Sequence, residues 1–295
     1  MEVLRGRRLA QPDEPIFDQG LAFDLESVLI NRRRVLRLMG LAGAAVGVAA
    51  CAPAAVLTPS PAGTSGSTST AGATSTAGAT TAAADCDVIP EETNGPFPAD
   101  GTNGPNVLTE SGIVRTDIRS SFGGSSGTAE GIPLSITLAI QDAGKSCGPL
   151  AGAAVYVWHC DREGRYSIYS QGATDQNYLR GVAEAGSDGK VTFQSIFPAC
   201  YTGRWPHVHF EVYPSLAKAI DAGNRLATSQ IALPKSICDA VYATSGYEAS
   251  VGNLSGLSLN TDMVFRDDGA AHQLGTMGGT LAGGLTVALS VPVST

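Results

Sequence analysis

The segment from Arg204 to Val212 concentrates side chains that could bind a metal ion. It reads Arg-Trp-Pro-His-Val-His-Phe-Glu-Val and holds two of the chain's four histidines, His207 and His209. Side chains alternate between the two faces of a β-strand, so both imidazoles should share one face with Glu211, with the intervening apolar residues turned toward a core. Adjacent imidazoles are a ready pair of metal ligands. Two surface histidines would give the same pattern, so the pair alone does not identify a site.

Two tyrosines precede this pair in polar, turn-forming segments. Tyr201 lies six residues before His207, in Pro-Ala-Cys-Tyr-Thr-Gly, and Tyr166 closes the segment Trp158–Tyr166, Trp-His-Cys-Asp-Arg-Glu-Gly-Arg-Tyr. A single tyrosine is more often a packed aromatic residue than a metal ligand. The combination of both tyrosines with both histidines makes them candidate ligands.

These segments resemble the iron site of the intradiol ring-cleavage dioxygenases, the family of catechol 1,2-dioxygenase and protocatechuate 3,4-dioxygenase. The family's W-x-x-N/D-x-x-G-x-Y segment, its P-x-x-Y segment and an arginine three residues before an H-x-H pair all occur here in order. Weaker matches are a T-x-G-P-[FY] loop, an R-x-D-I segment and a glutamine-bearing strand. The matching residues are Trp158, Asp161, Gly164 and Tyr166; Pro198 and Tyr201; Arg204, His207 and His209; Thr93–Phe97; Arg115–Ile118; and Thr228–Gln230. The likeness covers residues 88–265.

The resemblance implies an enzyme that uses Fe(III) and dioxygen to open a small aromatic diol between its two hydroxyl-bearing carbons, giving a muconate-type dicarboxylate. Its metal ligands would be Tyr166, Tyr201, His207 and His209. Two tyrosinates are hard anionic donors and favour iron(III) over iron(II). Which catechol is the substrate stays open.

The resemblance also implies three catalytic roles. Tyr201 would leave the metal and accept a substrate proton. Arg204 would stabilise negative charge on the ring, and Gln230 would assist near dioxygen. The other two histidines have no such role, since His159 is expected to be structural and His272 exposed.

Two other classes of protein remain possible on the sequence alone. One is a non-catalytic β-sandwich binding module anchored to the cell envelope. The other is a zinc hydrolase built on the H-x-H pair, which would need a third ligand, such as Glu211, and an open position for water. Neither gives Tyr166 and Tyr201 a function.

The elements that must position these residues read as strands. Apolar residues alternate with small or polar ones over Leu134–Ile140 and Leu285–Val291, and short apolar runs occur at Val155–Val157 and Val191–Phe193. The only helix expected is Leu216–Leu226. Short strands separated by glycine-rich turns predict an all-β sandwich with mixed or antiparallel sheets and long loops. Residues 86–295 are expected to form this single domain.

The residues before this domain are predicted to be an export signal followed by a linker. Residues 1–51 contain Asn-Arg-Arg-Arg-Val-Leu-Arg followed by an uncharged stretch and Val-Ala-Ala-Cys, which predicts a twin-arginine export signal with a lipoprotein-like cleavage box. Residues 52–85 are almost entirely Ala, Thr, Ser, Gly and Pro and are expected to be a disordered linker. The predicted protein is held at a membrane surface of the cell envelope by a lipid on Cys51.

Cysteine usage and charge set further expectations. Five cysteines follow Cys51, and an exported protein is expected to use them in two disulfides, with Cys86 the candidate for the unpaired thiol. The pairing of Cys86, Cys147, Cys160, Cys200 and Cys238 is not determined by the sequence, and neither is the oligomeric state. The net charge is −8, and Lys and Arg are not clustered beyond the first 37 residues, which excludes a nucleic-acid partner.

Overall fold

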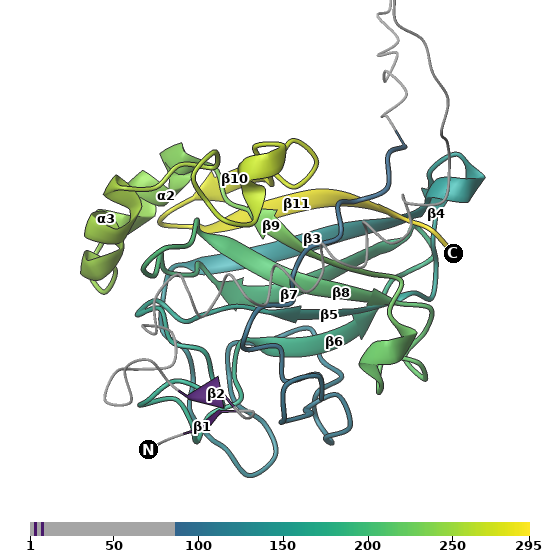
Figure 1. Cartoon of the computed structure of the whole chain (residues 1–295), viewed down its shortest axis with the longest axis horizontal. Helices are drawn as coiled ribbons and strands as arrows, with labels where there is room; N and C mark the ends of the chain where they lie inside the picture. The colour runs from purple at the N-terminus through teal and green to yellow at the C-terminus, as the bar shows by residue number, and fades with distance from the viewer. Residues whose placement is uncertain (1–2, 5–6, 9–85) are drawn as a thin grey trace, which may run out of the picture. The chain divides into compact units, whose positions relative to one another are not determined.

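The computed structural model describes Val3–Leu4, Arg7–Arg8 and residues 86–295 (Figure 1). Strands β1 (Val3–Leu4) and β2 (Arg7–Arg8) pair antiparallel with each other. Apart from these four residues, the predicted export signal and the predicted linker lie outside the described part of the chain. Within that part, no helix has the length and apolar character needed to cross a membrane.

Residues 86–295 contain two larger β-sheets. In the first, β10, β11, β3 and β4 follow one another, and β7 also pairs with β3; in the second the order is β6, β5, β8, β9. The β11–β3 pair is parallel and the other pairs are antiparallel, as the predicted mixed sandwich requires. The strand bounds are β3 Pro133–Asp142, β4 Gly148–Pro149, β5 Ala154–Trp158, β6 Arg180–Glu184, β7 Lys190–Ile196, β8 His207–Tyr213, β9 Ala227–Ala232, β10 Thr276–Thr280 and β11 Gly284–Val293.

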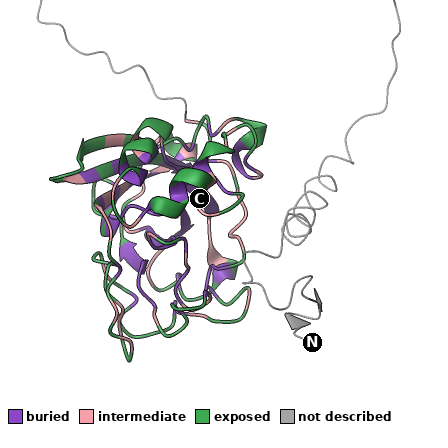
Figure 2. Cartoon of the chain, turned by 90° about the vertical axis from the view of Figure 1, so that its left-hand side faces the viewer, coloured by how far each residue is buried: buried purple, intermediate pink, exposed green. Residues whose placement is uncertain are grey.

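The second sheet is buried on both faces, and this position shapes the candidate site. On one face, Val208 and Phe210 of β8 pack into a core shared with Leu134 and Ile136 of the first sheet. The opposite face is covered by a second apolar cluster, to which Phe97, Val107, Leu108 and Ile113 contribute alongside Tyr156, Trp158 and Tyr166. All seven residues of β8 are therefore buried, including its histidines. Figure 2 colours the described part of the chain by burial class.

The helices differ from the prediction. Residues Leu216–Leu226 form turns and a single 3-10 turn, η3 (Ala222–Asn224), because the Asp221 side chain accepts a hydrogen bond from the Gly223 N–H and caps a turn that ends after three residues. Among residues 86–295, two α-helices lie further on, α2 at Lys235–Tyr242 and α3 at Glu248–Ser255. Two more 3-10 turns are η2 (Ala143–Lys145) and η4 (Phe265–Asp267).

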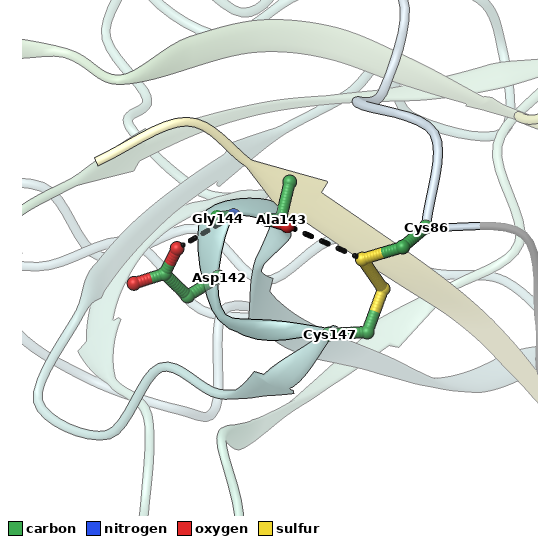
Figure 3. Close-up of a disulfide and its surroundings, with 5 residues drawn as sticks. All are labelled: Cys86, Asp142, Ala143, Gly144 and Cys147. Atoms are coloured by element: carbon green, nitrogen blue, oxygen red, sulfur yellow. Dashed lines mark hydrogen bonds between the residues drawn. A yellow bond between two sulfur atoms is a disulfide. The ribbon is translucent and has the colours of Figure 1, made fainter.

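The expected disulfide pattern was wrong in two respects. Cys86 is bonded to Cys147, so it is not the unpaired thiol (Figure 3). No second disulfide forms among residues 86–295, where Cys160, Cys200 and Cys238 are free and buried. Their thiol groups lie against the backbone oxygens of Ala199, Arg204 and Leu233, respectively, and pack as small apolar residues.

Candidate metal centre

Four side chains from three segments converge on one point. The Tyr166 Oη lies 3.5 Å from the Tyr201 Oη, 3.3 Å from the His207 Nε2 and 3.2 Å from the His209 Nε2. The His207 Nε2 is 3.3 Å from the Tyr201 Oη and 3.0 Å from the His209 Nε2. We call these four atoms the four-donor site. Donors that share one ion through bonds of about 2 Å, at angles of about 90–120°, are separated by roughly 2.8–3.5 Å, so the spacing fits a single metal ion.

The histidines reach this point because of the register of β8. His209 pairs with Trp158 on β5 and with Gln230 on β9. The Trp158 and His209 rings are stacked, with centroids 4.8 Å apart and planes 7° from parallel. A buried indole face thus fixes the orientation of the His209 ring, and Nε2 is directed at the other donors.

A compact turn brings Tyr166 and Tyr201 together. The Asp161 carboxylate accepts hydrogen bonds from the backbone N–H groups of Glu163 and Arg165 and from the Tyr178 hydroxyl. Gly164 completes the turn at φ +85°, and a Cβ there would lie 3.1 Å from the Tyr201 Cβ. The spacing of Asp161, Gly164 and Tyr166 is therefore a steric requirement of the site.

The protonation of the histidines suits metal binding. The His207 Nδ1 lies 2.5 Å from the Trp205 carbonyl oxygen, which can only accept, so Nδ1 carries the proton and the Nε2 lone pair points into the four-donor site. Burial, followed by the charge of Arg204, lowers the pKa of His207 to about 3. Burial and the neighbouring His207 hold the pKa of His209 well below its usual range. Both imidazoles are therefore neutral at physiological pH and able to bind a metal ion.

The tyrosines would not ionise at this place without a cation. Burial raises the pKa of Tyr166 well above its usual value, and burial also raises the pKa of Tyr201. A bound cation reverses this tendency, because it stabilises the phenolate. One buried and one partly buried phenol against two imidazoles form a donor set suited to a hard, highly charged ion such as Fe(III).

The zinc alternative finds less support in the geometry. Among residues 86–295, no group of three or more His, Cys, Asp or Glu side chains is placed to hold a metal ion. Glu211 is on the histidine face of β8 as predicted, but its Oε2 accepts a hydrogen bond from the Tyr213 hydroxyl at 2.6 Å. Burial, then the nearby Asp100, raises the pKa of Glu211 to about 8. A protonated carboxyl group is a poor metal ligand.

Arg204 and Gln230 lie together beside the four-donor site. The Arg204 Nη2 donates a hydrogen bond of 2.7 Å to the Gln230 Oε1, and the Gln230 Nε2 donates one of 2.9 Å to the Thr93 carbonyl oxygen. Both predicted catalytic residues are buried, Arg204 at 8% exposure and Gln230 at 0%. The predicted T-x-G-P-[FY] loop is thus tied to Gln230 through Thr93.

The same loop covers the ligands from above the sheet. The Phe97 ring lies 4.9 Å from that of Tyr166, and a Cβ at Gly95 would lie 3.3 Å from the His209 Cε1. Arg180, buried at 1% exposure, donates to the carbonyl oxygens of Phe97 and Pro98 and to Ser167 next to Tyr166. This clamp holds the loop against the site.

Sequence reasoning missed two polar residues near the site, Arg180 and Asp262. Asp262 is fully buried, and its Oδ2 accepts hydrogen bonds from the Arg204 Nε at 3.0 Å and from the Trp205 N–H at 2.6 Å. Asp262 is 58 residues from Arg204 along the chain, and no local pattern signals their contact. The Leu-Arg-Gly run at Leu179 gave no chemical signal either, because Arg180 lies at the start of β6 among apolar residues.

The two remaining histidines lie as expected. His159 is buried, with Nε2 2.6 Å from the Ser195 Oγ, and burial lowers its pKa to about 4. It is a satisfied core histidine that links the two sheets. His272 is exposed to solvent.

Comparisons with known proteins find dioxygenases among the proteins similar to this chain. The sequence model of a family described as "Dioxygenase" matches residues 104–220, which include all four donors of the site. A chlorocatechol 1,2-dioxygenase of Rhodococcus opacus is 42% identical over 53 residues, which are 18% of this chain and 21% of that protein's length.

A solved structure shares the fold. An intradiol ring-cleavage dioxygenase from Tetranychus urticae superposes with a TM-score of 0.56 at 24% identity, over 71% of this chain and 95% of that one. The 3-chlorocatechol 1,2-dioxygenase from Rhodococcus opacus has a TM-score of 0.45 at 15% identity, over 70% of this chain and 72% of that one. In its matched family region, its ordered motifs and its sandwich fold, this chain is similar to the intradiol dioxygenases.

Proposed function

We propose that the chain is an iron(III)-dependent dioxygenase that cleaves a catechol-type ring between its two hydroxyl-bearing carbons and yields a muconate-type dicarboxylate. The observation that carries the proposal is the four-donor site, in which two phenol oxygens and two imidazole nitrogens lie 3.0–3.5 Å apart. When bound there, Fe(III) would supply the Lewis-acid and redox chemistry that makes a catecholate reactive toward dioxygen.

The two tyrosines take different roles because their surroundings differ. Tyr166 is 1% exposed and packs against Phe97, so it stays fixed. Tyr201 is only partly buried and lies in the irregular segment before β8. Tyr201 is therefore the phenol that can swing aside when a diol enters and can hold a proton taken from a substrate hydroxyl.

Arg204 supplies the positive charge for the reaction. Its guanidinium is fixed at Nε by Asp262 and at Nη2 by Gln230, and Nη1 has no hydrogen-bond partner among residues 86–295. A preorganised cation in a buried site stabilises negative charge that develops on a bound ring. Gln230, opposite His209 on β9, is placed to assist beside the metal.

The proposal also covers location. The arginine-rich segment, the apolar stretch and Cys51 support export by the twin-arginine route, followed by lipid attachment at the membrane surface of the cell envelope. Residues 52–85 would link this anchor to the domain of residues 86–295. Cys51→Ser should abolish incorporation of a labelled fatty acid and release the protein from the membrane fraction; unchanged labelling would refute the anchor.

Oxygen consumption by the iron-loaded domain tests the activity. We expect stoichiometric oxygen uptake with at least one of catechol, protocatechuate and hydroxyquinol, together with the ultraviolet absorption of a muconate-type product. His209→Ala should abolish both signals, and His272→Ala, a change at an exposed histidine, should leave them intact. An iron-loaded protein that consumes no oxygen with any diol of the panel would refute the proposed reaction.

A further inference from the structure

Asp262 is a buried carboxylate that the four-donor site does not use. It is 0% exposed and precedes η4, in a stretch where the sequence gave no sign of a function. Its carboxyl group accepts four hydrogen bonds. Oδ1 accepts from the backbone N–H groups of Val264 and Phe265, and Oδ2 accepts from the Arg204 Nε and the Trp205 N–H.

These contacts connect Asp262 both to the Arg204 side chain and to the backbone before His207. Asp262 accepts from the Arg204 Nε and so fixes one edge of the guanidinium. Gln230, on β9, accepts from the Arg204 Nη2 and fixes another part of it. Through the Trp205 N–H, Asp262 fixes the peptide that precedes the His207 segment, and the Trp205 carbonyl in turn accepts from the His207 Nδ1. Asp262 therefore reaches both the charge-stabilising arginine and the backbone beside a ligand.

We infer that Asp262 is a positioning residue that sets the place of the Arg204 guanidinium beside the four-donor site. The inference rests on the proposed function. A paired, hydrogen-bonded carboxylate can hold a buried arginine in one rotamer at little net electrostatic gain, so its value is geometric. Arg204 would otherwise adopt other rotamers, because the Gln230 contact alone leaves the rest of the side chain unconstrained.

The test is a double-mutant cycle with Asp262→Asn and Arg204→Ala, made in the iron-loaded protein. Asparagine has nearly the shape of aspartate, but one of its two groups is an NH₂ donor. If the carbonyl keeps the Val264 and Phe265 N–H groups, the NH₂ faces Arg204 and Trp205, which are themselves donors. We expect Asp262→Asn to keep its iron and to lower kcat about 10- to 100-fold while KM changes less than about threefold.

In the Arg204→Ala background, Asp262→Asn should change kcat by less than about twofold, because the group through which it acts is absent. Asp239→Asn is the matched control, since Asp239 is an exposed carboxylate paired with Lys235 on α2, and it should behave as wild type. A wild-type kcat in Asp262→Asn overturns the inference. An equal loss of kcat in both backgrounds, or loss of iron in both, also overturns it and assigns Asp262 to the Trp205 backbone instead.

The inference can still be tested if Asp262→Asn fails to fold. If Asp262→Asn does not accumulate as folded protein, Asp262→Glu keeps the charge and displaces it by one methylene group, and the same cycle applies with the same two outcomes. Failure of the proposed function has a different signature, in which wild-type protein itself consumes no oxygen. In that case the crystal structure of the variant decides, since an unmoved Arg204 in Asp262→Asn or Asp262→Glu contradicts a positioning role.

Discussion

Two neutral histidines, His207 and His209, provide two of the four donor atoms of the candidate site through their Nε2 atoms. His207 is held by the Trp205 carbonyl at Nδ1, and His209 is stacked on Trp158. Neither ring has room to turn within a strand whose seven residues are all buried. The surrounding protein therefore holds both rings in place, and each of the four donors should be individually necessary for metal binding.

His209→Ala should reduce bound iron to near background, because removal of one of four ligands leaves too few donors for tight binding. Iron per chain, measured by elemental analysis after ferric loading, checks the expectation. His272→Ala is the control, since it removes an exposed histidine from the same chain. Equal iron in the two variants would mean that His209 is not a ligand.

The ionisation of one carboxylate near the site should also be visible in stability. Burial raises the pKa of Glu92 to about 7, and Asp267 and Asp268 add to the effect while Gln273 and Arg204 oppose it. A carboxyl group with a raised pKa stabilises the fold fully below its unfolded pKa near 4.5, and this contribution is lost as the pH rises through about 7.

Glu92→Gln should therefore be more stable than wild type at pH 8, by on the order of 2 kcal/mol, and closer to wild type at pH 5. Thermal unfolding across this range measures the difference. Glu248→Gln serves as a control of opposite type, because the Gly246 N–H holds the pKa of Glu248 below its usual value and its effect should be constant above pH 5. A pH-independent difference for Glu92→Gln would contradict the protonated state of the buried carboxyl group.

At the scale of the elements, two glycines with the same backbone conformation allow backbone strain to be distinguished from steric contact with a ligand residue. Gly164 and Gly203 have φ of +85° and +84°, but a Cβ at Gly164 would meet Tyr201 at 3.1 Å and one at Gly203 would meet nothing within 4 Å. Both replacements with alanine carry the same cost of a left-handed conformation, about 1 kcal/mol.

Gly164→Ala should lower iron content and activity as well as stability, because Tyr201 must shift away from the new methyl group. Gly203→Ala should lose a similar amount of stability from strain but keep its iron. Unfolding midpoints and iron per chain, measured side by side, make the comparison. Identical iron content in both variants would show that the close approach of Gly164 to Tyr201 does not hold the ligand in place.

Alternating hydrophobic patterns predicted most of the strands, but contacts between residues distant in the sequence could not be predicted. Alternation in β3 and β11 reports burial on one face and predicted the sandwich. In β8, which is buried on both faces, alternation still predicted the shared face of His207 and His209. The helix expected at Leu216–Leu226 was wrong because a capped turn at Asp221 outweighed its apolar residues. Helix α2 was missed although Cys238, Val241 and Tyr242 form a buried stripe at helical spacing.

The site itself was predictable only as far as its motifs are local. The four donors come from segments whose residue types are unusual together, so their convergence could be expected. Asp262 and Arg180 act on residues more than 50 positions away, and their partners include backbone atoms that carry no sequence signal. Disulfide pairing failed for the same reason, since burial of three thiols depends on the packed core.

At the scale of the whole molecule, one covalent bond closes a long loop at the start of the domain. The Cys86–Cys147 disulfide joins residue 86 to the turn between η2 and β4, 61 residues away (Figure 3). It ties the first described residue of this domain to the first sheet. A cross-link of this loop length is worth about 2–4 kcal/mol of stability, mainly through the unfolded chain.

The double variant Cys86→Ser/Cys147→Ser should unfold at a lower temperature than wild type and keep its iron, because neither cysteine lies on a segment of the four-donor site. A reducing agent should lower the midpoint of wild type and leave that of the variant unchanged. A variant as stable as wild type would contradict a stabilising role for the bond.

The central claim is that Tyr166, Tyr201, His207 and His209 bind one ferric ion, and the visible absorption spectrum of the Fe(III)-loaded protein tests it most directly. We expect a red-brown protein with a tyrosinate-to-iron charge-transfer band that shifts and weakens in Tyr166→Phe. Tyr169 lies outside the four-donor site, and its hydroxyl donates a hydrogen bond to the Asn103 side chain. Tyr169→Phe should therefore keep the wild-type spectrum. A colourless protein after ferric loading, or a band that Tyr166→Phe does not change, would contradict the account.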